Sequence, residues 1–153
     1  ILDRVVIANS TGQGAPNAAQ MWTDRATLAR TQGMSTLVQP TLSRWFTDPY
    51  RAQHAEVMAR IGEMIQNTPV EGYAGCCAAI AELATLEKLH TLQLPCLVLV
   101  GDQDQATPPA MSEQIHQHWP NSQFEVLKDA AHLSSVEQAQ AFTESVMRFL
   151  QPT

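Results

Sequence analysis

The strongest constraint on the fold is an uninterrupted apolar run, CLVLV at residues 96–100, which leads directly into the polar stretch GDQD. A strand without polar residues on either face must be covered on both sides, which is the situation of a strand inside a parallel α/β sheet. Two shorter runs, RVVIA at residues 4–8 and QFEVL at 123–127, have the composition of neighbouring strands. The sequence therefore predicts a buried parallel sheet with helices packed against both faces.

Between the first and second predicted strands the sequence shows only helical periodicity. We expect helices at residues 17–32, 34–46, 48–67 and 69–83. The last of these has a capping box formed by Thr68 and Glu71. The domain boundaries predicted from this pattern are a sheet domain made of residues 1–16 and 85–153, and a helical insertion made of residues 17–84.

The second half of the chain alternates helices and strands. A helix beginning at Thr107-Pro108-Pro109 joins the second strand to the third, and an amphipathic helix begins at Ser134, where Glu137 completes another capping box. This order predicts parallel strands joined by right-handed crossovers. Three strands leave long exposed edges and an uncovered apolar face, so we expect the segment to belong to a larger fold.

Composition excludes several classes of partner. Nine basic residues are spread along a chain of net charge −6, so the clustered Lys and Arg that nucleic acid or an anionic membrane surface requires are missing. No apolar run approaches the roughly 20 residues of a membrane-spanning helix. Three cysteines form neither a disulfide framework nor a metal-binding spacing, which predicts a reducing, cytoplasmic location and core roles for Cys76, Cys77 and Cys96.

We expect no metal and no organic cofactor, because four histidines that could serve as ligands are not grouped: His54, His90, His116 and His118.

Two residues that follow predicted strands can carry chemistry. Asp104 comes four residues after CLVLV and His132 comes five residues after QFEVL. Because the carboxyl ends of neighbouring parallel strands meet at one edge of a sheet, these loops should lie side by side. A carboxylate that accepts the Nδ1 proton of an imidazole leaves Nε2 free as a base. Taken singly, either residue has an ordinary explanation, a turn aspartate or a core histidine, and Asp102 is an equally acidic neighbour.

The sequence resembles the α/β-hydrolase family over essentially its whole length. GDQDQATPP is similar to the acid loop of that family and DAAHLSSVEQ to its histidine loop, while the helical insertion lies where the family's lid enters. Five segments resemble more closely the 3-oxoadipate enol-lactonases of protocatechuate and catechol catabolism: VIANSTG, RWF at 44–46, TPVEGY at 68–73, CCAAI at 76–80 and AAHLSSVEQ.

The resemblance implies roles for individual residues. Asp104 would orient the imidazole, His132 would act as the base, and Asp102 would remain a loop residue. A serine would attack the carbonyl of a lactone or ester, without a cofactor. In the lid, Trp45 is a candidate pocket aromatic and Arg44 a candidate partner for a substrate carboxylate. The ordinary alternatives are a core aromatic and a solvated surface arginine, and they apply equally to Trp22 and Arg25.

The remaining question is the nucleophile, and Ser10 in Ala8-Asn9-Ser10-Thr11-Gly12 is the candidate in the right chain order. A nucleophile elbow needs a helix that starts at the serine, and here Gly12, Gly14 and Pro16 follow at once. We therefore interpret Ser10 as the end of a strand.

We expect the nucleophilic serine in a missing N-terminal half of the same fold, which would be the partner of this segment. Without it the segment should be inactive and should dimerise, swap or aggregate through its exposed strand edge. Two alternatives stay open: another hydrolase of the same fold, such as a carboxylesterase, a haloperoxidase-like enzyme or a carbon–carbon bond hydrolase, and a helical interaction module without chemistry.

Overall fold

The structure, a computed structural model, describes residues 2–151. Backbone contacts divide it into two compact units. The first, the sheet unit, is made of Ile1–Gly12, Arg44–Thr47 and Thr85–Thr153. The second, the helical unit, is made of Gln13–Ser43 and Asp48–Ala84.

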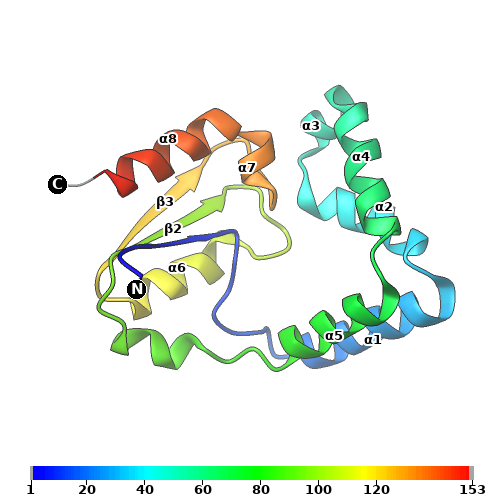
Figure 1. The fold of residues 1–153 in the computed structure, drawn as a ribbon, viewed down its shortest axis with the longest axis horizontal. Helices are drawn as coiled ribbons and strands as arrows, with labels where there is room; N and C mark the ends of the chain where they lie inside the picture. The colour runs from blue at the N-terminus through cyan, green and yellow to red at the C-terminus, as the bar shows by residue number, and fades with distance from the viewer. Residues whose placement is uncertain (1, 152–153) are drawn as a thin grey trace. The chain divides into compact units, whose positions relative to one another are not determined.

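The sheet unit contains three parallel strands in the order β1-β2-β3 (Figure 1). They are β1 (Val5–Ala8), β2 (Cys96–Gly101) and β3 (Ser122–Leu127). Val5 lies opposite Cys96 and Cys96 lies opposite Ser122, so β2 is the central strand of the three. Every residue of β2 is buried, as its apolar run predicts. The predicted parallel α/β arrangement is confirmed.

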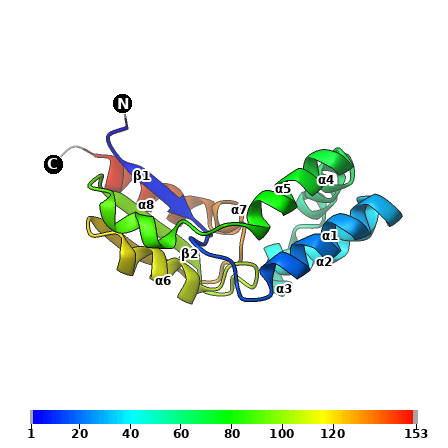
Figure 2. The same ribbon diagram turned by 90° about the horizontal axis from the view of Figure 1, so that it is seen from below.

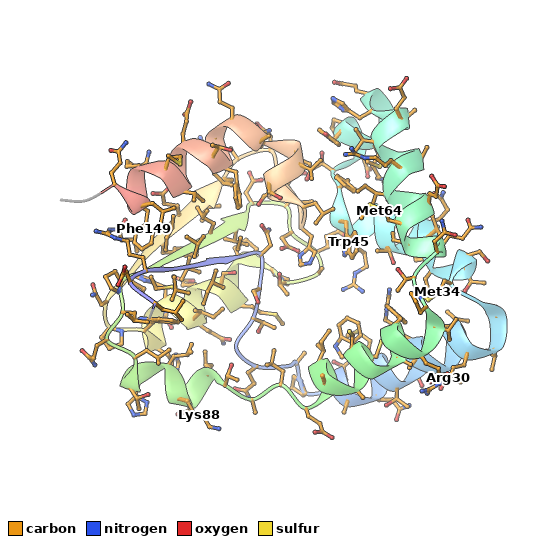
Figure 3. All side chains as sticks on the ribbon, viewed as in Figure 1. Arg30, Met34, Trp45, Met64, Lys88 and Phe149 are labelled. Carbon is orange, nitrogen blue, oxygen red and sulfur yellow. The ribbon has the colours of Figure 1, made fainter. Side chains whose placement is uncertain are left out.

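Helices cover both faces of this sheet. Successive side chains of β2 point to opposite faces, so they pack against different helices. Cys96 and Val98 pack with residues of the 3₁₀ helix η1 (Leu86–Thr91) and of α6 (Pro109–His118). Leu97 and Leu99 pack with Phe149 of α8 (Ala139–Leu150) on the other face, as the inward direction of Phe149 in Figure 3 illustrates. Side chains of a strand alternate between faces, so one apolar run supplies both layers of the core.

The helical unit is built from the remaining helices: α1 (Ala18–Gln32), most of α2 (Ser35–Trp45), α3 (Asp48–Gln53), α4 (Ala55–Gln66) and α5 (Val70–Ala81). The helices α1 and α5 run side by side (Figures 1 and 2). Ala26, Ala74 and Cys77 are buried between them, and small side chains there allow the two backbones to approach closely. At one end of the pair, Arg30 of α1 binds Glu71 of α5 at 2.8 Å.

The single helix predicted at 48–67 is wrong, because α3 ends at Gln53 and α4 begins at Ala55. His54 between them has φ −125° and ψ 55°, outside the helical region. Its ring stacks on Tyr50 with centroids 3.9 Å apart, and its Nδ1 lies 2.9 Å from the Tyr50 carbonyl oxygen. The His54 amide still donates to the Tyr50 carbonyl at 3.0 Å, so the interruption is a change of the His54 backbone angles and not a lost hydrogen bond.

Both predicted capping boxes are also wrong. The Thr68 hydroxyl donates to the carbonyl of Met64, in the helix before it, and Glu71 pairs with Arg30 rather than with the helix start. The helix predicted from Ser134 is interrupted at Gln138, giving a short α7 (Ser134–Glu137) before α8. No side chain caps α7.

Two of the three predicted core cysteines, Cys77 and Cys96, are buried, and the prediction is wrong for Cys76, which is exposed. Burial in apolar surroundings raises the pKa of the Cys96 thiol to about 11. Among the helices in residues 2–151, none is long and apolar enough to cross a membrane.

Candidate active site

The two residues that the strand pattern selects meet in the sheet unit. His132 Nδ1 lies 2.9 Å from Asp104 Oδ2, within hydrogen-bond distance. Asp104 stands in the loop after β2 and His132 in the loop after β3, so adjacent parallel strands bring together residues far apart in the chain. The Asp104 side chain is completely buried, whereas 22% of the His132 side chain is exposed. The Nδ1 edge of the imidazole is thus held by a buried carboxylate while part of the ring is exposed.

The Asp104 carboxylate accepts four further hydrogen bonds. They come from the Ala106 amide at 2.8 Å, the Thr107 amide at 2.9 Å, the Thr107 hydroxyl at 3.0 Å and the Asn9 side-chain amide at 3.0 Å. Burial by itself would raise the pKa of this carboxyl. The hydrogen bonds from His132, Asn9 and the Thr107 backbone outweigh burial and hold the Asp104 pKa below its ordinary value. The carboxylate is therefore kept ionised and fixed in orientation.

Asn9, directly after β1, forms hydrogen bonds with both the Asp104 loop and the His132 loop. Its side-chain nitrogen donates to Asp104 and also to the Ala131 carbonyl at 3.1 Å, while its side-chain oxygen accepts from the Ser134 hydroxyl. Its backbone has φ 48°, in the left-handed region that Asn tolerates better than most residues. Sequence reasoning missed this role. The available signal was an Asn directly after the strand that pairs with β2, whose loop carries Asp104.

The two weaker candidates from the sequence both lie in the sheet unit. The Trp45 indole is 6.1 Å from the His132 ring, centroid to centroid, and is tilted by 34°. The Trp45 carbonyl accepts from the amide of Leu133 at 3.0 Å. Arg44 lies beside the acid loop, where its guanidinium donates to the Gln105 carbonyl at 3.4 Å. Trp45 and Arg44 are both half-buried, so each retains exposed surface near the pair.

Ser10 and Asp102 form no hydrogen bond with His132 in the described part of the chain. No helix begins at Ser10, since α1 starts at Ala18, and the Ser10 carbonyl accepts from the Ser112 hydroxyl at 3.1 Å. Asp102 is exposed and accepts from the Ala130 amide at 3.2 Å. Within residues 2–151, no serine hydroxyl or cysteine thiol forms a hydrogen bond with His132.

Glu137 is a second residue whose contacts near the pair the sequence did not predict, since the pattern there indicated only a capping box. It is buried in α7, and its carboxylate accepts from the Ala131 amide and from both the amide and the hydroxyl of Thr47, each of the latter two at 2.8 Å. A charged residue that ends up buried needs such partners. The signal that could have found it is its place five residues after His132, within the turn that leads into an amphipathic helix.

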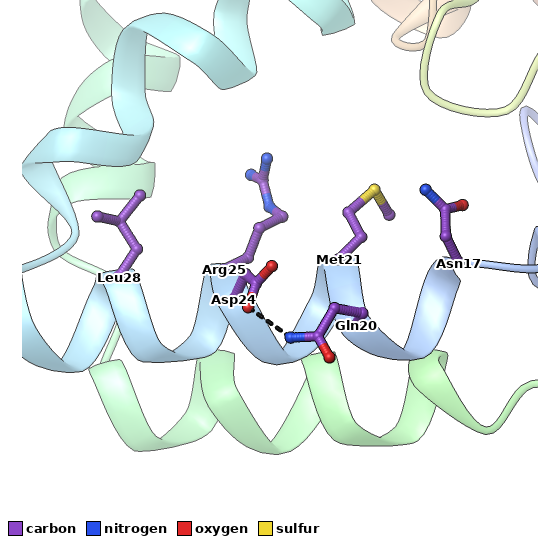
Figure 4. A pocket seen from close by; sticks show the side chains of 6 residues that line it. All are labelled: Asn17, Gln20, Met21, Asp24, Arg25 and Leu28. Carbon is purple, nitrogen blue, oxygen red and sulfur yellow. Dashed lines mark hydrogen bonds between the residues drawn. The ribbon is translucent and has the colours of Figure 1, made fainter.

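A shallow hollow of about 360 Å³ lies along α1 in the helical unit (Figure 4). Its lining is formed by Asn17, Gln20, Met21, Asp24, Arg25 and Leu28. Gln20 donates to Asp24 at 2.8 Å, and Arg25 donates to the Tyr73 hydroxyl at 2.9 Å. This lining holds no histidine, serine or cysteine. Across the described part of the chain, no group of three or more His, Cys, Asp or Glu residues is arranged to hold a metal ion.

Comparison with known proteins shows which family the chain belongs to. Residues 12–139 match the alpha/beta hydrolase fold family. Over 144 residues, 94% of this chain and 53% of the relative, the sequence is 35% identical to 3-oxoadipate enol-lactonase 2 of Acinetobacter baylyi. The chain thus spans about half the length of the curated relatives it matches.

Solved structures give the same result. The enol-lactonase from Burkholderia xenovorans LB400 superposes with a TM-score of 0.92 and 35% identity, covering 97% of this chain and 56% of that one. A thermophilic esterase from Thermogutta terrifontis superposes with a TM-score of 0.88 and 29% identity, covering 97% of this chain and 56% of that one. The fold, the strand order and the family match lead to one conclusion: the chain belongs to the α/β-hydrolase fold family.

Proposed function

We propose that this chain provides the acid and the base of a serine-dependent hydrolase of lactones or esters, with the enol-lactone of 3-oxoadipate as the preferred substrate. The observation that carries the proposal is the 2.9 Å contact between the buried Asp104 carboxylate and the partly exposed His132 ring. A carboxylate on Nδ1 fixes the tautomer that has its lone pair on Nε2. This is the arrangement of a general base that can activate a hydroxyl group.

In the proposed reaction His132 Nε2 takes the proton of a serine hydroxyl as the serine oxygen attacks the lactone carbonyl. Asp104 stabilises the imidazolium that forms. The proton then passes to the departing enol oxygen, the ring opens, and the enol becomes a ketone. His132 next activates a water molecule that hydrolyses the acyl-enzyme. We propose that the serine lies outside these 153 residues, because Ser10 lacks the helix start of a nucleophile elbow.

The relatives support the choice of the enol-lactone as substrate. Two 3-oxoadipate enol-lactonases of Acinetobacter baylyi are 35% and 33% identical to this chain, over 94% and 89% of its length. The substrate carries a carboxylate beside its lactone ring. Arg44 and Trp45 are the cationic and aromatic groups that the sheet unit offers near His132. We propose that they contact this substrate.

The test is hydrolysis of the enol-lactone by the full-length natural chain, followed as loss of the enol-lactone absorbance. We expect turnover by the wild type and by a His90→Ala control, since His90 is exposed and lies in η1, outside both loops. His132→Ala should reduce kcat by about 10³-fold or more, because it removes the base. An unchanged kcat in His132→Ala would refute the assignment.

The similarity to the Thermogutta terrifontis esterase favours a second candidate, hydrolysis of open-chain carboxylic esters. A panel of short-chain esters and methyl esters, assayed beside the enol-lactone, separates the two. A higher kcat/KM for the lactone supports the first candidate. A higher kcat/KM for an open-chain ester replaces it with the second, while the roles of Asp104 and His132 stay the same.

A further inference from the structure

Glu137 is a buried carboxylate that accepts hydrogen bonds from the His132 loop and from Thr47. On one side, the amide of Ala131, the residue before His132, donates to one carboxylate oxygen. On the other side, the amide of Leu133, the residue after His132, donates to the Trp45 carbonyl. Trp45 belongs to the same short segment as Thr47, whose amide and hydroxyl both donate to the other oxygen of Glu137.

These contacts hold the backbone on both sides of His132. The chain on both sides of His132 is thereby attached to Glu137, directly through Ala131 and indirectly through the Trp45–Thr47 segment. The Trp45 indole next to the imidazole is attached to the same point. The imidazole can form its hydrogen bond to Asp104 only if the backbone of His132 places Nδ1 within hydrogen-bond distance of the carboxylate.

The chemistry of the side chain matters as well as its position. A carboxylate can accept hydrogen bonds on both oxygens, and Glu137 uses both. An amide offers one accepting oxygen and one NH₂ group that only donates. In Glu137→Gln, either the Ala131 amide or the two Thr47 donors would therefore face another donor in a buried setting, where an unmade hydrogen bond is costly.

We propose that Glu137 is a positioning residue: it holds the His132 loop and the Trp45 segment in one arrangement, so that the imidazole stays on Asp104 and the indole stays beside the imidazole. The inference rests on the proposed roles of Asp104 and His132. Glu137 does not touch a reacting atom, and it acts through the backbone of Ala131 and of Thr47.

The experiment compares Glu137→Gln with wild type in the full-length chain. We expect kcat to fall about tenfold to a hundredfold, since displacement of a catalytic group by about 1 Å can cost 10²-fold. The second readout needs no substrate: the low-field proton resonance of His132 Nδ1–H, which the bond to Asp104 protects from solvent exchange. We expect this signal in wild type, and we expect it to broaden or disappear in Glu137→Gln while most backbone amide signals stay in place.

The matched control is Glu144→Gln, which makes the same chemical change at an exposed position of α8. It should keep the wild-type kcat and the His132 signal. If Glu137→Gln also keeps both, the proposal is overturned. If Glu137→Gln does not fold, Thr47→Val takes its place, because this variant removes the hydroxyl that donates to Glu137 and keeps the backbone amide. Thr47→Val must then lower kcat and weaken the His132 signal relative to Glu144→Gln. Wild-type values for both would overturn the proposal.

The two readouts separate this inference from the proposed function. Loss of the His132 signal in Glu137→Gln supports a positioning role even if wild type hydrolyses neither lactone nor ester. In that case the proposed function fails and the positioning role stands.

Discussion

At the scale of single residues, the clearest distinction is between Asp104 and Asp102, which the sequence offers as equals. Asp104 is buried and accepts hydrogen bonds from Asn9, Thr107 and His132, whereas Asp102 is exposed. The difference arises because the loop after β2 turns one carboxylate toward β1 and β3 and leaves the other in solvent. A carboxylate needs such fixed donors to stay ionised when buried.

Asn9 gives a prediction about stability that separates its side chain from its backbone. Asn9→Ala and Asn9→Gly should both cost about 1–3 kcal/mol of unfolding free energy, since each leaves buried polar groups of Asp104, Ala131 and Ser134 short of a partner. Asn9→Ala should be the worse of the two by about 1 kcal/mol, because an alanine is strained at φ 48° and a glycine is not.

Urea denaturation of the variants measures these differences. Asn67, at the end of α4 with φ −87°, is the matched control, and there glycine should have no advantage over alanine. If Asn9→Gly is no more stable than Asn9→Ala, the left-handed backbone contributes nothing to the choice of Asn at this position.

At the scale of elements, the candidate site depends on how closely the histidine loop approaches the end of β2. A Cβ atom on Gly101 would lie 2.3 Å from the Ala130 carbonyl oxygen and 2.4 Å from that of Ala131. These are backbone atoms, so no side-chain rotation can relieve the contact. Gly101 therefore permits the acid loop and the histidine loop to lie against each other.

Gly101→Ala should accordingly destabilise the protein by about 3 kcal/mol or more, because the loop that carries His132 has to move. Gly75→Ala is the matched control: Gly75 lies inside α5 with open space around its Cα, and alanine should stabilise that helix by about 0.5–1 kcal/mol. Thermal unfolding of both variants is the measurement. A Gly101→Ala protein as stable as wild type would show that the close approach is not needed.

At the scale of the whole molecule, the parallel sheet was predictable because CLVLV and its two companions have only one way to be covered. The meeting of Asp104 with His132 followed from topology, since each residue comes shortly after one of two adjacent parallel strands. Local patterns were less reliable. Periodicity makes residues 48–67 one continuous helix, whereas the His54 backbone leaves the helical region between α3 and α4.

The buried polar residues were the hardest to predict, for a physical reason. Asn9 binds Asp104 and Ser134 across 95 and 125 positions of sequence, and Glu137 binds Thr47 across 90. No spacing rule connects residues so far apart. The capping-box pattern at Ser134 and Glu137 instead suggested a local hydrogen bond, and long-range burial replaced it. The assignment of residues 17–84 as a lid stays a prediction.

The central claim is that Asp104 and His132 act together as the acid and base of a hydrolase. The most direct measurement is kcat/KM of Asp104→Asn and Asp102→Asn in the full-length chain, with the substrate that wild type hydrolyses best. Our account predicts a fall of about 10³–10⁴-fold for Asp104→Asn, because the amide favours the wrong imidazole tautomer. It predicts near wild-type activity for Asp102→Asn, whose amide oxygen can still accept from Ala130. Full activity in Asp104→Asn, or an equal loss in both variants, would contradict it.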